Sequence, residues 1–258
     1  MYLEKYNLDG KISVVTGGTQ GIGLAIAEAL AEAGSRVVAL TNDQDQIPSA
    51  TERMTELGYE YEARVLDVTN STAVADMAAQ IESEVGAVDI LVNNAAISPA
   101  FIGAESTPDE LYLKVLDVNL NGVFWCSRSF GAAMLKRGTG SIVNIGSMSG
   151  VISNIPQDHS PYNISKAGVH HLTKSLAAEW AAEGVRVNCV APTYIETKLT
   201  AFGMTENPEM AEVWLDMTPM GRVGQPDEIA SVVLFLASDA ASLMTGSIVM
   251  ADAGYTLW

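Results

Sequence analysis

Tyr162 and Lys166 are the two residues of this sequence whose types and spacing best suit proton transfer. Residues four positions apart lie on one face of a helix, so the ammonium group can approach the phenol. A free tyrosine has a pKa of about 10, and lowering it by about three units requires about 4 kcal/mol. A cation about 4 Å away supplies roughly this energy at an effective dielectric constant of about 20. The pair therefore predicts a tyrosine acid–base, although the same spacing alone is also common on surface helices.

A glycine-rich segment near the N-terminus, Thr16 to Gly23, is the second candidate for chemistry. It reads T-G-G-T-Q-G-I-G and lies between a predicted strand and a predicted helix. Glycines let the backbone turn tightly and approach a phosphate, whose charge the N-terminus of a helix favours. A plain tight turn is the alternative interpretation, but the position between the first strand and the first helix favours a phosphate site.

Both candidates need rigid elements to position them, and the sequence alternates short strands with longer helices. Strands are expected over residues 12–16, 36–40, 62–66, 90–92, 141–145, 186–190 and 247–250, and helices over 23–33, 49–57, 73–85, 109–137, 162–182 and 227–237. This alternation predicts an α/β fold: a single Rossmann domain over residues 1–258, with a doubly wound, seven-stranded parallel sheet and helices on both faces. The stretch from about 193 to 225 interrupts the pattern and is rich in apolar residues, so we expect a substrate lid there.

The charge of the chain excludes several classes of partner. Its formal net charge is −17, so no excess of Lys and Arg can neutralise nucleic-acid or lipid phosphates.

Cys126 and Cys189 lie far apart and outside any metal-ligand spacing, so we expect reduced thiols and no metal site. The charged N-terminus lacks the apolar core of a signal peptide, and no run reaches the about 20 apolar residues of a membrane span. We therefore expect a cytoplasmic protein that binds a small neutral molecule, not nucleic acid or membrane.

The T-G-x-x-x-G-x-G spacing resembles that of the short-chain dehydrogenase/reductase family, and further motifs match the family in order. Asp67-Val68 matches its adenine-contacting pair, 93–96 resembles its N-N-A-G turn, and 192–197 resembles its P-G-x-x-x-T motif. Ala96 and Thr193 stand where the last two motifs have glycine. The resemblance implies a nicotinamide dinucleotide bound by Gly17, Thr19, Gln20, Gly21, Ile22, Gly23, Asp67, Val68, Asn94, Ala95, Ala96, Tyr162, Lys166, Pro192, Ile195 and Thr197.

The same resemblance implies a catalytic set of Asn119, Ser147, Tyr162 and Lys166, and with it the interconversion of a secondary alcohol and a ketone. Ser147 is expected to hydrogen-bond the substrate oxygen, and Tyr162 to exchange the hydroxyl proton. Lys166 would lower the pKa of Tyr162 and hold the nicotinamide ribose. Asn119 would position a water that links Lys166 to solvent, and a buried amide bonded to backbone is a second interpretation of this residue.

The residues after the second strand bear on the choice of dinucleotide. NAD-preferring members of the family place an Asp where this chain has Thr41, and NADP-preferring members place a cation where it has Asn42 or Gln20. A 2′-phosphate without a cation would be poorly compensated in so acidic a protein. Asp43 could reach the ribose instead, or be a solvated loop carboxylate. We therefore expect NAD rather than NADP, with Thr41, Asn42 and Asp43 beside it.

Polar residues between Ser147 and Tyr162 bear on the substrate. Asn154, Gln157 and His159 could donate to several hydroxyls, as a polyol requires, although a solvent-facing loop histidine explains His159 equally well. The expected substrate contacts are Ser147, Asn154, His159 and Tyr162. Residues 146–150, 214–222 and the ending Gly-Tyr-Thr-Leu-Trp resemble polyol-oxidising members of the family, which implies a polyol or ketose substrate and a homotetramer. The alternatives are a 3-oxoacyl-thioester reductase using NADPH and a non-catalytic dinucleotide-sensing protein.

Overall fold

Seven short strands form the centre of the molecule, close to the positions that the sequence predicts. The computed structural model describes residues 1–99, 101–198, 200 and 207–258. The strands are β1 (Ile12–Thr16), β2 (Arg36–Thr41), β3 (Tyr61–Val65), β4 (Ile90–Asn93), β5 (Gly140–Ile145), β6 (Val185–Pro192) and β7 (Ile248–Ala251). They pair in parallel in the order β3-β2-β1-β4-β5-β6-β7. The predicted doubly wound, seven-stranded parallel sheet is confirmed.

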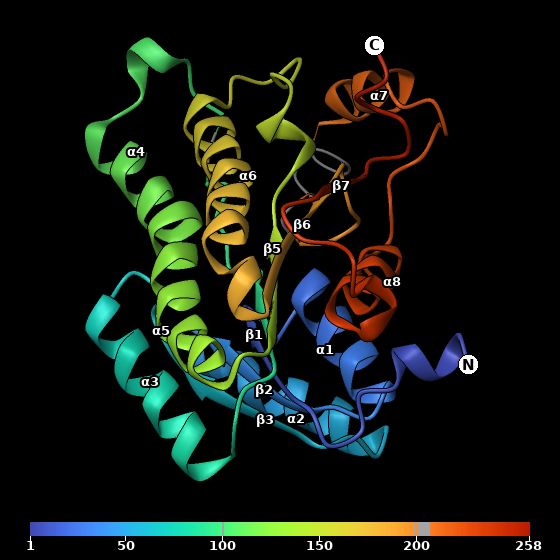
Figure 1. Cartoon of the computed structure of the whole chain (residues 1–258). Coiled ribbons are helices and arrows are strands. Elements are labelled where there is room, and N and C mark those ends of the chain that lie inside the picture. The colour runs from blue at the N-terminus through green and yellow to red at the C-terminus, as the bar shows by residue number, and fades with distance from the viewer. Residues whose placement is uncertain (100, 199, 201–206) are drawn as a thin grey trace.

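Helices cover both faces of this sheet (Figure 1). They are α1 (Gly21–Glu32), α2 (Ile47–Glu56), α3 (Ser71–Glu84), α4 (Asp109–Leu116), α5 (Gly122–Arg137), α6 (Ser160–Trp180), α7 (Pro208–Asp216) and α8 (Pro226–Ala237). Helices α1 and α8 pack together on one face, while α3, α5 and α6 pack on the other. Within the described residues, none of these helices combines the length and apolar character that crossing a membrane requires.

Alternate strand residues point to opposite faces of the sheet, which produces two apolar cores. In β1, Val15 packs into the core beneath α1 and α8, and its neighbour Val14 packs into the core beneath α3 and α5. Neither valine is accessible to solvent. The runs of Val and Ile that predict buried strands therefore serve both layers at once, and they make the sheet a rigid base for loops at its edge.

The helix predicted over 109–137 is interrupted by a π-helical turn, Asp117–Asn121, between α4 and α5. Such turns are rare and are found frequently at functional sites. The turn contains Asn119, whose side chain is completely buried. Hydrophobic periodicity did not predict this irregularity, because a turn of five residues is too short to show a period of its own.

The predicted lid, about 193–225, is described in part, since residues 199 and 201–206 lie outside the described residues. Its described portion contains α7, which lies beside the C-terminal segment in Figure 1. Trp214 of α7 is 2% exposed and packs in one apolar cluster with Tyr194 and Tyr255. The described part of the lid is therefore anchored to the body of the domain by an aromatic contact.

Candidate active site

A cavity of about 360 Å³ lies where the carboxyl ends of the strands meet. Residues that follow β1, β2, β3, β4, β5 and β6 line it, which is the edge where open α/β sheets bind ligands. The cavity brings together most of the predicted site residues: Gly17, Gln20, Gly21, Ile22, Gly23, Thr41, Asn42, Asp67, Val68, Asn94, Ala95, Ala96, Ser147, Asn154, His159, Tyr162, Lys166, Pro192, Ile195 and Thr197.

The glycine-rich turn forms one end of this cavity. Gly17 and Gly21 have φ angles of 63° and 53°, a region that favours glycine. Gly23 is so closely packed that an added Cβ would lie 2.0 Å from the carbonyl oxygen of Gly17. The N-cap of α1, Gln20, makes no side-chain capping bond, and the first turn of the helix has no acidic residue. The amide groups of this helix end are therefore available to an anion, which fits the pyrophosphate of a dinucleotide.

Asn94, the residue after β4, holds the glycine turn against the sheet. Its Nδ2 donates to the carbonyl oxygens of Thr16 and Gly17, at 3.0 and 3.1 Å. The backbone amides of Asn94 and Ala95 also donate to the hydroxyl of Thr16, at 3.0 and 3.1 Å. The cradle is therefore built from the ends of two paired strands, β1 and β4, and its shape is fixed by the backbone.

Two predicted cofactor residues, Thr19 and Asp43, do not line the cavity. The Thr19 hydroxyl donates to Gln46 Oε1 at 2.7 Å, and Gln46 Nε2 donates to Asp43 at 2.8 Å. The Asp45 amide also donates to Asp43, at 3.0 Å, so its carboxylate caps its own turn. These contacts favour the alternative interpretation of Asp43 as a loop carboxylate, and its contact with the ribose stays a prediction. Gln46 lines the cavity in its place, and no motif pointed to this loop glutamine.

The end of the cavity beyond the glycine turn is bordered by residues after β2 and β3. Asp67 and Val68 lie along it with Thr41 and Asn42. Asp67 accepts hydrogen bonds from the amide and hydroxyl of Thr69, at 2.9 and 2.8 Å. Among the described lining residues the lysines are Lys166, on α6, and Lys198, after β6, and there is no arginine. The described residues that follow β2 and β3 therefore contribute no cation to this border.

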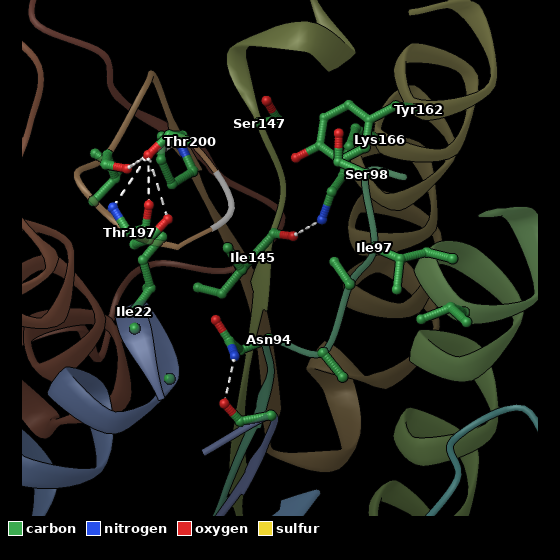
Figure 2. A pocket seen from close by; sticks show the side chains of 18 of the residues that line it. Ile22, Asn94, Ile97, Ser98, Ile145, Ser147, Tyr162, Lys166, Thr197 and Thr200 are labelled. Atoms are coloured by element: carbon green, nitrogen blue, oxygen red, sulfur yellow. Dashed lines mark hydrogen bonds between the residues drawn. The ribbon is translucent and has the colours of Figure 1, made fainter. Parts of the chain in front are cut away.

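At the opposite end, α6 carries Tyr162 and Lys166 toward Ser147 (Figure 2). Lys166 Nζ donates to the carbonyl oxygen of Ile145 at 2.8 Å and lies 5.6 Å from the centre of the Tyr162 ring. Ser147, just beyond β5, shares a hydrogen bond with the Tyr162 side chain. Tyr162 and Lys166 lie on one side of the helix, as the spacing predicts, and Ser147 lines the same cavity.

Burial dominates the ionisation of this group in the structure. Burial raises the pKa of Tyr162, and the hydrogen bond with Ser147 offsets part of the rise. Burial also lowers the pKa of Lys166 to about 8, so the ammonium form still prevails at pH 7. Lys166 Nζ is directed at the Ile145 carbonyl oxygen, and the lowering of the Tyr162 pKa by Lys166 stays a prediction.

Asn119 lies in the π-helical turn and does not line the cavity. Its Oδ1 accepts from the Ile97 amide at 2.8 Å, and its Nδ2 donates to the Ile97 carbonyl at 2.9 Å and to Ser165 Oγ at 3.2 Å. These contacts support the interpretation of a buried amide bonded to backbone. Asn119 anchors Ile97, which does line the cavity, and the placement of a water by Asn119 stays a prediction.

His159 lies against the tyrosine instead of facing solvent. Its ring stacks on Tyr162, with centroids 4.5 Å apart and planes 5° apart. His159 Nε2 pairs with the Ser98 hydroxyl at 2.8 Å, and Phe101 packs edge-on at 4.9 Å. Burial lowers the pKa of His159 to about 4, so the imidazole is neutral at pH 7. His159 therefore holds the Tyr162 ring by contact and not by charge.

The far wall is formed by what we call the Tyr194 cluster: Asn154, Gln157, Tyr194, Trp214 and Tyr255. Tyr194 Oη accepts from Asn154 Nδ2 at 3.1 Å and from Gln157 Nε2 at 3.0 Å. The Trp214 indole stacks on the Tyr194 ring at 3.8 Å and donates to Gln157 Oε1 at 3.0 Å. All members except Tyr255 line the cavity. Both amides donate one hydrogen bond to Tyr194, and their contact with substrate hydroxyls stays a prediction.

Sequence reasoning did not single out Ser98, Phe101 and Tyr194 as site residues, although all three line the cavity. Ser98 and Phe101 follow the 93–96 motif by a few residues in a segment without regular pattern. Tyr194 had a usable signal, since an aromatic residue occupies a variable position inside the 192–197 motif. A large side chain at a position that the backbone aims into a ligand site is a candidate contact.

Comparisons with known proteins agree with this geometry. A family model described as enoyl-(acyl carrier protein) reductase matches residues 17–256. Galactitol 2-dehydrogenase of Rhizobium johnstonii is 52% identical over 257 residues, which cover 100% of this chain and 99% of the relative. The L-tagatose-forming galactitol 2-dehydrogenase of Cereibacter sphaeroides is 49% identical over 258 residues, with the same coverage. The crystal structure of gox2181 matches with a TM-score of 0.98 and 53% identity over 100% of both chains.

These similarities extend over the whole length of the domain, from the glycine turn to the C-terminal segment. Their length and identity agree with the order of motifs along the sequence and with the meeting of Ser147, Tyr162 and Lys166 in one cavity. The protein is an oxidoreductase that acts on CH–OH groups. The chain belongs to the short-chain dehydrogenase/reductase family.

Proposed function

We propose that this protein interconverts a polyol and the corresponding ketose, with NAD as cofactor and Tyr162 as the acid–base. The observation that carries the proposal is one cavity with a glycine cradle at one end and Ser147, Tyr162 and Lys166 at the other. The two relatives named as galactitol 2-dehydrogenases support a polyol as the substrate class. The cavity thus joins a candidate anion site and a candidate proton-transfer site.

Each side chain has a defined task in the proposed reaction. A bound NAD would supply the hydride acceptor that oxidation of the alcohol carbon to a ketone requires. Ser147 holds the substrate oxygen and thereby fixes the reacting carbon. Tyr162 Oη takes the hydroxyl proton during oxidation and returns it during reduction. Lys166 holds the ribose, and its positive charge favours the phenolate form of Tyr162.

The acidity of Tyr162 depends, in this proposal, on the loaded site. Burial raises the pKa of Tyr162 in the structure, because a low dielectric disfavours the phenolate. The same low dielectric strengthens the attraction between a phenolate and any nearby cation. Positive charge added beside Lys166 in this cavity therefore lowers the Tyr162 pKa far more than the same charge would in water.

NAD is favoured over NADP by the residues that follow β2. Thr41 accepts from the Asp43 amide at 3.1 Å, and Asn42 is the exposed residue beside it. Neither carries a charge that could pair with a 2′-phosphate, and the described residues after β2 and β3 that line the cavity include no Lys or Arg. A phosphate dianion here would have no charged partner among them, while the ribose hydroxyls of NAD need only neutral hydrogen-bonding groups.

A neutral substrate is favoured by the Tyr194 cluster and its neighbours. Asn154, Gln157, Tyr194 and Trp214 carry no charge, and His159 is neutral because burial lowers its pKa to about 4. Amide and hydroxyl groups of this kind suit the several hydroxyls of a polyol. We expect a carboxylate-bearing sugar acid to bind less well, since this wall offers it no cation.

We further propose that the enzyme assembles as a homotetramer. The C-terminal Leu257 and Trp258 are 76% and 75% exposed, and such apolar residues are suited to contact between subunits. Light scattering after size-exclusion chromatography should give about four times the chain mass of 27.3 kDa. A mass equal to that of one chain would contradict the assembly.

The proposed activity is tested by a substrate panel with both cofactors. We expect NAD reduction with at least one polyol of four to six carbons, and slower or no reaction with NADP. Exclusive reduction of acetoacetyl thioesters by NADPH would contradict the proposal in favour of a thioester reductase. Tight NAD binding without turnover of any alcohol would contradict it in favour of a dinucleotide-sensing protein.

A further inference from the structure

The hydrogen bonds of the Tyr194 cluster have a direction that the indole imposes. Trp214 Nε1 can only donate, so the atom of Gln157 that faces it at 3.0 Å must be the carbonyl oxygen. The amide nitrogen of Gln157 then faces Tyr194 Oη, at 3.0 Å. The stacking of Trp214 on Tyr194, with planes 10° apart, keeps this three-membered arrangement rigid. The orientation of the Gln157 amide is therefore fixed by its neighbours.

Asn154 is held by the same phenol oxygen. Its Nδ2 donates to Tyr194 Oη at 3.1 Å, so this oxygen accepts from two amides. Tyr194 also shares a hydrogen bond with Tyr255, and the Tyr255 hydroxyl oxygen can accept the bond that the Tyr194 hydroxyl donates. Because the side-chain nitrogen of Asn154 is bound to Tyr194, only the side-chain oxygen of Asn154 is free to face another partner.

This Asn154 oxygen is enclosed and has no hydrogen-bond partner among the described residues. Asn154 is 8% exposed and lines the cavity. A buried acceptor without a partner is costly, and most such atoms in proteins are satisfied by a donor. The cavity beside it is where a substrate would bring one.

We propose that Tyr194 is a positioning residue that orients the Asn154 amide so that its oxygen accepts a hydrogen bond from a substrate hydroxyl other than the reacting one. This inference rests on the proposed polyol function and specifies how the substrate is recognised. The wall then selects for a hydrogen-bond donor at one carbon of the substrate. A carbonyl, a fluorine or a hydrogen at that carbon cannot donate and is disfavoured.

The members of the cluster come from four separate parts of the chain. Asn154 and Gln157 precede α6, Tyr194 follows β6, Trp214 belongs to α7, and Tyr255 lies near the C-terminus. The lid helix and the C-terminal segment thus both help to fix the orientation of the Asn154 amide. The proposal assigns these distant segments a role in substrate choice through Tyr194, without contact with the reacting atoms.

The test uses Tyr194→Phe, which keeps the aromatic ring and removes the hydroxyl. Affinities of the wild-type protein with bound NADH, which cannot oxidise an alcohol, are measured by calorimetry for a polyol substrate and for analogues in which one hydroxyl at a time is replaced by fluorine. We expect one non-reacting position to cost about tenfold more than the other non-reacting positions, the effect of about one hydrogen bond. In Tyr194→Phe this extra penalty should largely disappear while the penalties at the other positions stay unchanged. Tyr6→Phe, remote from the cavity, is the matched control.

An unchanged position-specific penalty in Tyr194→Phe would overturn the proposal, and so would an equal loss at every position, which indicates a merely structural role. Neutron diffraction of the wild-type crystal adds a readout that does not need turnover. We expect deuterons on the Asn154 atom that faces Tyr194, which identifies that atom as the nitrogen. An atom without deuterons there would be the oxygen, and this result would also overturn the proposal. If no polyol reacts or binds, the proposed function fails, and the neutron structure still decides the orientation of the amide.

Discussion

The two ends of the cavity are built in different ways. At the glycine end, the contacts are made by backbone atoms from the ends of β1 and β4, and Asn94 binds the two together. At the Tyr194 end, side chains from residues 154 to 255 meet through hydrogen bonds and ring contacts. Under the proposed function, cofactor binding depends on short, local motifs, and substrate choice depends on packing between distant segments. Mutations at the two ends should consequently affect different measurable quantities.

The largest effect is expected for Tyr162→Phe, which should lower the rate of the reaction and leave cofactor binding unchanged. The change removes the proton-exchanging hydroxyl but keeps the ring that stacks on His159. We expect kcat to fall by about a thousandfold, while the Kd for NADH, measured by fluorescence, changes by less than about threefold because the glycine turn is untouched. A kcat within about tenfold of wild type would contradict the role of Tyr162.

Gly23→Ala should damage the glycine end alone. The added Cβ would lie 2.0 Å from the Gly17 carbonyl oxygen, so the turn must shift. We expect the free energy of unfolding to fall by about 2 kcal/mol and the Kd for NAD to rise at least about tenfold. Denaturant titration and calorimetry measure the two quantities.

Gly58→Ala is the matched control for this change. Gly58 also has a positive φ, 76°, but an added Cβ there meets no atom within 4 Å. The substitution should cost about 1 kcal/mol of stability through backbone strain alone, with no change in the Kd for NAD. If both variants lost cofactor affinity equally, the close packing of Gly23 would not be the cause.

His159→Phe, at the substrate end, should change how the free energy of unfolding depends on pH below pH 6.5. Burial gives His159 a pKa of about 4 in the folded protein, below its ordinary value of 6.5. Between these values the unfolded chain binds a proton that the folded protein does not, so stability falls as the pH drops from 6.5 to 4. Because the ring is partly exposed, we expect the variant to lack about 1–2 kcal/mol of this decline.

Urea titrations of both proteins at several pH values measure this slope. The phenylalanine ring preserves the stack on Tyr162, so the stability at pH 7 should change little. An identical decline in the two proteins would show that His159 titrates normally in the folded state.

The smallest effect is expected in the C-terminal segment that carries Tyr255. Ala253 has a φ of 53°, a positive value that alanine adopts at a cost. We expect Ala253→Gly to raise the free energy of unfolding by about 0.5–1 kcal/mol, measured by thermal and urea unfolding. Ala181→Gly, at a helical position with φ −58°, is the control and should lower it by a similar amount. A stability loss in both variants would contradict the strain at Ala253.

The fold and the tight turn at the glycine-rich segment were largely predictable from the sequence, for a physical reason. Buried parallel strands require continuous Val and Ile, as in β1, and a phosphate cradle requires glycines at fixed spacing, as at Gly17, Gly21 and Gly23. Both requirements act over a few neighbouring residues. They therefore leave a readable local pattern.

The substrate end was less predictable, because its contacts join residues far apart in the chain. Nothing local indicates that Trp214 donates to Gln157, or that Asp43 supports Gln46 instead of facing the cavity. The spacing of Tyr162 and Lys166 predicted their common helix face. It did not predict that the Ile145 carbonyl would bind the ammonium group. Which partner each polar side chain binds depends on the groups that the complete fold brings close to it.

We propose that Tyr162 becomes an effective acid–base only in the loaded site, and the ionisation of this side chain tests the proposal directly. The phenolate absorbance of wild type minus Tyr162→Phe, followed against pH, reports the titration of this one side chain. Without cofactor we expect a pKa above the ordinary value of 10, as burial dictates. With NAD bound we expect this pKa to fall below the ordinary value, toward the working pH, where a general base is effective. A pKa that is the same in both states would contradict the account.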